Sequence, residues 1–97
     1  MQINTFSTEG LLKVNLQSLT SKSIASGATV TWQESPDSIT GYKPIAVVGF
    51  ETSISSQNVS VMSSRINGSG QIEISIRNNT GGSISTSPRM TILYIRN

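Results

Sequence analysis

The chain has no cysteine and no histidine in 97 residues, and aspartate occurs only once, as Asp37. Histidine is the usual general base near neutral pH, and thiolates and imidazoles are the usual ligands of transition metals. Without cysteine there is also no disulfide framework, which argues against a small secreted eukaryotic domain. The composition therefore favours a structural or binding protein over an enzyme.

Charged residues are also scarce, at 12% of the chain, and the formal net charge is +2. The seven basic residues are spread singly, whereas nucleic-acid binding needs several cations that converge on phosphates. The longest clean apolar run, residues 45–48, is far shorter than a membrane span. Residues 1–9 have neither a cationic start nor an apolar stretch, so no export signal is expected. We expect no nucleic-acid partner and no membrane insertion.

β-branched residues dominate the apolar side chains that are present. Ile occurs 12 times and Val six times, against five Leu and three Ala. Such side chains suit a pleated sheet, and good helix formers are few. We predict one all-β domain over residues 1–97, an antiparallel β-sandwich of jelly-roll type. It should have seven to eight short strands and no significant helix.

Alternation of apolar and polar residues locates the strands. The clearest covers residues 71–77, where Ile72, Ile74 and Ile76 share one face and Glu73 and Arg77 lie on the other. Further strands are expected at residues 12–16, 28–32, 42–50, 59–62 and 90–95. Turns are expected at residues 34–38, at 67–70 as a hairpin tip, and at 78–82, where the residues tolerate positive φ.

Two of these strands, residues 44–50 and 90–95, are apolar on both faces. In a small sandwich only one face of each sheet meets the core, and no helix is available to cover the other. An uncovered apolar face favours association, so a like subunit is the simplest cover. A tightly wrapped monomeric barrel is the alternative.

Residues 27–97 resemble the small β-sandwich domains at the C-termini of bacteriophage tail fibres and related receptor-binding proteins. The shared features are Trp32, a Gly-Tyr-x-Pro start to the apolar strand of residues 41–50, an Arg-Asn-Asn turn at 77–79 and a closing Leu-Tyr-Ile-Arg at 93–96. The resemblance implies a virion-associated module that recognises a bacterial surface or decorates the particle. It also implies three copies, so we expect a homotrimer. No shaft or collagen-like repeat precedes the domain, so an excised tip domain and a small decoration protein both stay open.

The sequence offers no catalytic constellation. Serine hydrolysis needs a base such as histidine, and no Ser-x-x-Lys occurs. Glycoside hydrolysis needs two carboxylates facing one cleft, and Glu34 and Asp37, neighbours in a turn, are better interpreted as solvated. No aspartate-rich loop suggests calcium. We expect no enzymatic activity, no catalytic residue, no cofactor and no metal.

Two aromatic residues are expected to be structural. Trp32 continues the face of Ala28 and Val30, so we interpret it as a core residue rather than a platform for stacking sugars. Tyr42, beside Pro44, is interpreted as a corner residue whose hydroxyl bonds to the backbone. Neither is therefore a candidate ligand contact.

Amide side chains in loops are the candidate ligand-binding residues: Gln57, Asn58, Asn67, Asn78 and Asn79. Amides on rigid strand ends suit hydrogen bonding to saccharide hydroxyls, although the same residues are also good turn formers. Three of them begin Asn-x-Ser/Thr sequons, which we interpret as loop markers.

These observations together favour a non-enzymatic phage virion module made in the bacterial cytoplasm. It would be a tail-fibre tip or receptor-binding domain that recognises a bacterial surface glycan or protein, with other virion proteins as further partners. A head-fibre or capsid-decoration protein is one alternative. A bacterial adhesin or carbohydrate-binding module is another, which the low aromatic content of 5% disfavours.

Overall fold

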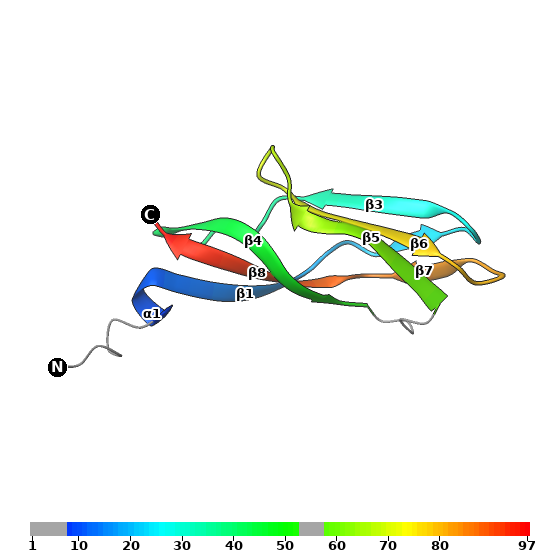
Figure 1. The fold of residues 1–97 in the computed structure, drawn as a ribbon, viewed down its shortest axis with the longest axis horizontal. Helices are drawn as coiled ribbons and strands as arrows, with labels where there is room; N and C mark the ends of the chain where they lie inside the picture. Colours follow the sequence, from blue (N-terminus) through cyan, green and yellow to red (C-terminus); the bar gives the residue numbers. More distant parts are fainter. Residues whose placement is uncertain (1–7, 53–57) are drawn as a thin grey trace.

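The computed structural model describes residues 8–52 and 58–97, which form a β-structure with one single-turn helix (Figure 1). The elements are α1 (Thr8–Leu11), β1 (Leu12–Ser18), β2 (Lys22–Ile24), β3 (Thr29–Glu34), β4 (Tyr42–Glu51), β5 (Val59–Ile66), β6 (Ile72–Asn78), β7 (Ile84–Thr86) and β8 (Arg89–Arg96). The prediction of an all-β fold with seven to eight short strands is confirmed. In the described part of the chain, no helix has the length and apolar character to cross a membrane.

The first three strands pair with the last three strands in reverse order. β1 pairs with β8, β2 with β7 and β3 with β6, all antiparallel. β4 then joins β8, and β5 joins β6, which gives two three-stranded sheets of order β1-β8-β4 and β3-β6-β5. Figure 1 shows these sheets as two layers, with the β2–β7 pair at the end away from the C-terminus. Two facing antiparallel sheets agree with the predicted β-sandwich.

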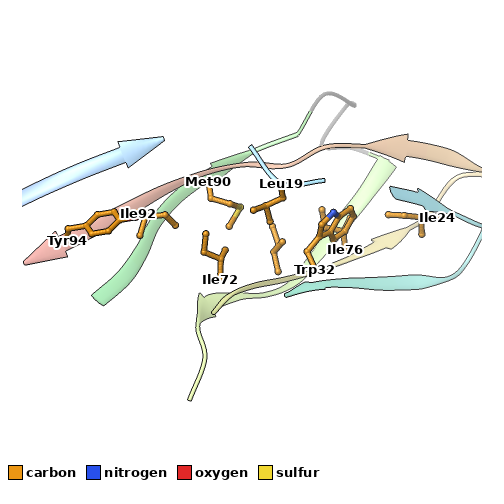
Figure 2. Close-up of a cluster of buried hydrophobic side chains, with 9 residues drawn as sticks. Leu19, Ile24, Trp32, Ile72, Ile76, Met90, Ile92 and Tyr94 are labelled. Atoms are coloured by element: carbon orange, nitrogen blue, oxygen red, sulfur yellow. The ribbon is translucent and has the colours of Figure 1, made fainter. Parts of the chain in front are cut away.

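The core lies between the facing sides of the two sheets (Figure 2). The fully or almost fully buried apolar side chains are Leu19, Ile24, Trp32, Ile72, Ile74, Ile76, Met90, Ile92 and Tyr94. β6 and β8 are the central strands of their sheets, so each sends alternate residues into the core. The predicted burial of the three β6 isoleucines and of Trp32 is confirmed.

Two aromatic side chains anchor the core to the surrounding loops. Trp32 Nε1 donates to the Thr20 carbonyl oxygen at 2.6 Å, and the Tyr94 hydroxyl donates to the Asp37 carbonyl oxygen at 2.7 Å. Burial raises the pKa of Tyr94, and the nearby Asp37 carboxylate acts in the same direction. The Tyr94 hydroxyl thus joins β8 to the loop before β4. The ring of Tyr42 lies under Lys13, whose Nζ is 5.1 Å from the ring centroid.

β1 turns its apolar side chains away from the core. Val14 and Leu16 are 60% and 58% exposed. The core side of the strand carries Asn15 and Gln17 instead, and both reach the loop before β4. Asn15 Nδ2 donates to Asp37 Oδ2 at 3.0 Å, and Gln17 Oε1 accepts from the Asp37 backbone N at 2.8 Å. Alternation predicted this strand correctly but did not determine which face is buried.

β2 and β7 lie in stretches where the sequence analysis expected no strand. Each has only three residues, too few for alternation to identify. They continue the β1–β8 ladder past a break that is bridged by the Leu19 backbone N, which donates to the Pro88 carbonyl oxygen at 2.8 Å. This extension brings Ile24 into the core.

β4 is covered on only one face. Pro44 lies near its start, as predicted, and two register shifts against β8 follow. Each shift leaves one extra residue, Ile45 and Val48, and both are exposed. Within one copy of the chain, β4 therefore has an exposed apolar side, contrary to the tightly wrapped monomeric barrel that was the alternative.

The two predicted turns after β5 and β6 differ in backbone conformation. Gly70 has φ of +80° at the β5–β6 hairpin, and its backbone N donates to the Asn67 carbonyl oxygen at 2.9 Å. In the described residues, the other positive φ values belong to Gly27 and Gly41. Residues 78–82 therefore turn without positive φ, because the Asn78 side chain organises their backbone instead.

Candidate functional site

The loop candidates fall at two ends of the β5–β6 hairpin. Asn58, Asn78 and Asn79 come together where β5 begins and β6 ends, and the Asn79 backbone N donates to the Asn58 carbonyl oxygen at 2.9 Å. Asn67 lies in the turn at the opposite end of the hairpin. Gln57 lies outside the described residues.

Asn78 is fully buried, and its side chain is used entirely within the protein. Its Nδ2 donates to the carbonyl oxygens of Ile24 at 2.9 Å and Gly82 at 2.7 Å. Its Oδ1 accepts from the Thr80 backbone N at 2.8 Å and from the Thr80 hydroxyl at 2.7 Å. The prediction of Asn78 as a ligand-binding residue is therefore wrong. Its amide ties β2 to the turn after β6.

Asn67 shapes the hairpin turn. Its Oδ1 accepts from the backbone N of Ser69 at 2.9 Å and of Gln71 at 3.0 Å, and its Nδ2 donates to Glu73 Oε1 at 3.2 Å. Asparagine commonly holds turns through such local bonds. Among the candidate amides that the structure describes, Asn58 and Asn79 are therefore the ones that remain exposed.

The exposed amides share their end of the sandwich with other polar groups. Asn79 Nδ2 donates to Ser60 Oγ at 2.7 Å, and Ser60 is the register partner of the exposed Arg77. Figure 1 shows this end of β6 at the opposite end of the molecule from α1 and the C-terminus. Amide, hydroxyl and guanidinium groups on paired strands can together donate to and accept from saccharide hydroxyls.

The outer side of sheet β3-β6-β5 is polar, and we call it the polar face. Its residues in register are Thr29, Thr31, Gln33, Ser60, Ser63, Arg65, Glu73, Ser75 and Arg77. Glu73 accepts from Gln33 Nε2 at 3.1 Å and from Arg65 Nε at 3.2 Å, besides its bond from Asn67. These bonds, with that from Gln33 the strongest influence, lower the pKa of Glu73 below its ordinary value of 4.5.

The lowered pKa of Glu73 predicts a loss of stability in acid. Because the folded-state pKa lies below the unfolded one, the carboxylate stabilises the fold above the ordinary pKa, and this contribution disappears as pH falls through the lowered value. Glu73→Gln should remove that part of the pH dependence. The measurement is the urea midpoint of parent and variant between about pH 5 and pH 2. Identical slopes for the two proteins would contradict the prediction.

The outer side of sheet β1-β8-β4 is apolar, and we call it the apolar face. Residues in register form three rows across it: Leu12, Ile95 and Lys43 in the first row, Val14, Leu93 and Ala46 in the second, and Leu16, Thr91 and Gly49 in the third. The bulge residue Val48 is 55% exposed. Isolated exposed apolar residues are ordinary, but a contiguous apolar face marks an interaction surface.

The third row of the apolar face is hollowed. An open hollow of about 310 Å³ is lined by Leu16, Gly49, Phe50, Glu51, Arg89 and Thr91. Gly49 contributes no side chain, and a Cβ there would lie 3.6 Å from the nearest atoms of Thr91. An ion pair between Arg89 and Glu51 lies at the rim. The hollow thus combines an apolar floor with a charged edge.

Two further carboxylates, those of Glu34 and Asp37, have structural partners. Glu34 Oε2 accepts from the Thr20 backbone N at 2.9 Å, and Asp37 accepts from Asn15. Within residues 8–52 and 58–97, no group of three or more His, Cys, Asp or Glu side chains could hold a metal ion.

The hollow could not be predicted from the sequence, because it depends on the register of β4 against β8, which the two shifts change. A glycine within an apolar run, Gly49, was the available signal. Comparisons of this chain with protein-family models, with characterised proteins and with solved structures found no match.

Proposed function

We propose that the chain is a non-enzymatic attachment module of a bacteriophage particle, a tail-fibre tip or receptor-binding domain. Its ligand would be a bacterial surface glycan or protein. The observation that carries the proposal is the exposed polar end formed by Asn58, Asn79, Ser60 and Arg77 on paired strands. The resemblance of residues 27–97 to tail-fibre domains supports the virion location.

Recognition at this end would rest on hydrogen bonds rather than on ring stacking. Trp32 and Tyr94 are fully buried, so neither offers a platform to a sugar. Phe50 is partly exposed, but it lies at the hollow on the other sheet. This arrangement weighs against an aromatic-stacking carbohydrate-binding module.

A capsid-decoration or head-fibre protein is the second candidate. Such a protein needs a docking surface more than a ligand site, and the apolar face is the observation that favours it. The two candidates differ in which surface contacts the other molecule. Variants confined to the polar end or to the apolar face therefore separate them.

Fluorescently labelled protein is expected to bind some members of a panel of bacterial strains. Lipopolysaccharide or capsular polysaccharide purified from a bound strain should compete if the receptor is a glycan, whereas protease treatment of the cells should abolish binding to a protein receptor. Asn79→Ala should weaken binding about fivefold to tenfold, the effect of losing one hydrogen bond of about 1 kcal/mol.

The matched control is Ser69→Ala, an exposed substitution at the opposite end of the same hairpin, which should bind like the parent. Absence of binding to every strain would count against the attachment function. Equal binding by the Asn58→Ala/Asn79→Ala double variant would remove the polar end as the site.

A further inference from the structure

We propose that the apolar face packs against the apolar face of a second copy of this chain. The two copies would be related by a two-fold axis that lies in the plane between the two apolar faces, perpendicular to the strands, at the level of Leu93. The interface would leave the polar end free, because Asn58 and Asn79 flank β5 and β6, which belong to the other sheet. The proposal is therefore independent of the attachment function.

The shape of the apolar face supports this arrangement. Along β8 and β4 the side chains become smaller, from Ile95 and Lys43 in the first row to Thr91 and Gly49 in the third. A two-fold axis perpendicular to the strands makes the strands of the two copies run in opposite directions. The first row of each copy then lies over the third row of the other copy. Large side chains of each copy then meet the hollow of the other, because two-fold contacts are self-complementary.

The charges on the apolar face support the same arrangement. Lys43 is the one charged residue among the three rows, and it is exposed. With rows reversed, Lys43 of one copy lies over Gly49 of the other. Its alkyl chain can fill the hollow while its ammonium group reaches the rim, as lysine side chains do at apolar surfaces. There it would join the ion pair between Glu51 and Arg89.

A copy of the chain fits this surface better than an acidic or basic partner. Apart from Lys43, the three rows carry no charge that such a partner could recognise. The hollow and the side chain that fits it also belong to the same face of the same chain. With ordinary strand spacings, the seven residues of β1 and the three strands give a face of about 14 by 23 Å. The projected area is thus about 320 Å² on each copy, which is smaller than a stable specific interface, so we expect weak association that depends on concentration.

Light scattering of the full chain at about 200 µM, a concentration suited to a weak interface, tests the proposal directly. The expected mass is twice the 10.4 kDa of the chain. A monomer at this concentration would overturn the proposal. Three times the chain mass would overturn the two-fold arrangement and agree with the homotrimer expected from the sequence.

A charge exchange tests the contact itself. Lys43→Glu is expected to weaken association at least about tenfold, since the new carboxylate would face Glu51 of the other copy. Adding Glu51→Lys should restore association, because the contact is then re-formed with the charges reversed. Arg77→Glu, an equally large charge change on the polar face, should have no effect. Failure of the double variant to recover would overturn the proposed contact even if a dimer forms.

Val14→Asp provides an independent check of the face. Val14 lies in the second row close to the axis, so the substitution would bring two carboxylates together and abolish the dimer. Because Val14 is 60% exposed, the variant monomer should melt close to the parent monomer at low concentration. A Val14→Asp dimer of parental affinity would rule out this face as the interface.

Discussion

Replacement of Ile74 by alanine is expected to lower the free energy of unfolding by about 2–5 kcal/mol, the usual range for truncating a buried isoleucine. Ile74 is fully buried at the centre of β6 and pairs in register with Trp32 on one side and Ser64 on the other. The surrounding strands are hydrogen-bonded on both sides, so the cavity cannot close easily. In a domain of this size the melting temperature should fall by at least about 10 °C.

Ile45→Ala is the matched control for that experiment, because it removes the same atoms from an exposed position in a bulge. It should change the stability of the monomer by a few tenths of a kcal/mol, about as expected for a surface substitution. Glu73→Ala, on the opposite face of β6, should also have a smaller effect than Ile74→Ala. If the Ile74→Ala and Ile45→Ala variants had the same melting temperature, the register of β6 would be wrong.

Asn78→Ala is expected to lower the free energy of unfolding by about 2–4 kcal/mol, although the residue looks like part of an ordinary polar turn. The substitution leaves the carbonyl oxygens of Ile24 and Gly82 and the backbone N of Thr80 without the partners that Asn78 provides. Asn79→Ala, at the exposed neighbouring position, should have an effect several-fold smaller. Equal effects of the two substitutions, measured by urea unfolding, would refute the structural role of Asn78.

The Asn78→Asp variant tests the same structural role through the pH dependence of its stability. Aspartate keeps the acceptor for Thr80, but an ionised carboxylate would face the carbonyl oxygens of Ile24 and Gly82 in a buried site. Burial would raise the pKa of the new carboxyl group in the folded state, so protonation would favour the fold. The variant should therefore gain stability relative to the parent as the pH falls from 7 to about 4. A constant difference across that range would show that the carboxyl group is solvated.

The faces of the central strands could be predicted from the sequence, because their chemistry is local. Ile72, Ile74 and Ile76 alternate with polar residues, and only one side of such a strand can be buried with stability. Trp32 follows the same rule on β3. The side chains of a strand alternate between its two faces, and this local geometry is enough to predict that these residues point into the core.

Other features depended on partners far along the chain. The alternation in β1 identifies two faces, but the loop that binds Asn15 and Gln17 decides which of them points inward. Asn78 looks like a turn residue until Ile24, 54 positions earlier, is seen beside it. The hollow at Gly49 appears only after two shifts in the β4–β8 register. In each case the function of the residue in the fold depends on a contact with residues far along the chain, which the local sequence does not show.

The pairing of early strands with late strands also determines when the sheets can form during synthesis. Leu12 pairs with Ile95, which is 95 − 12 = 83 positions later, and β8 lies between β1 and β4 in its sheet. Contacts over such separations close large loops and form slowly. During synthesis, β1 and β4 lack their neighbour until β8 has emerged from the ribosome. The nascent chain therefore carries first β1 and then also β4 without their partner, and it is in that interval that their unpaired edges are most exposed to aggregation.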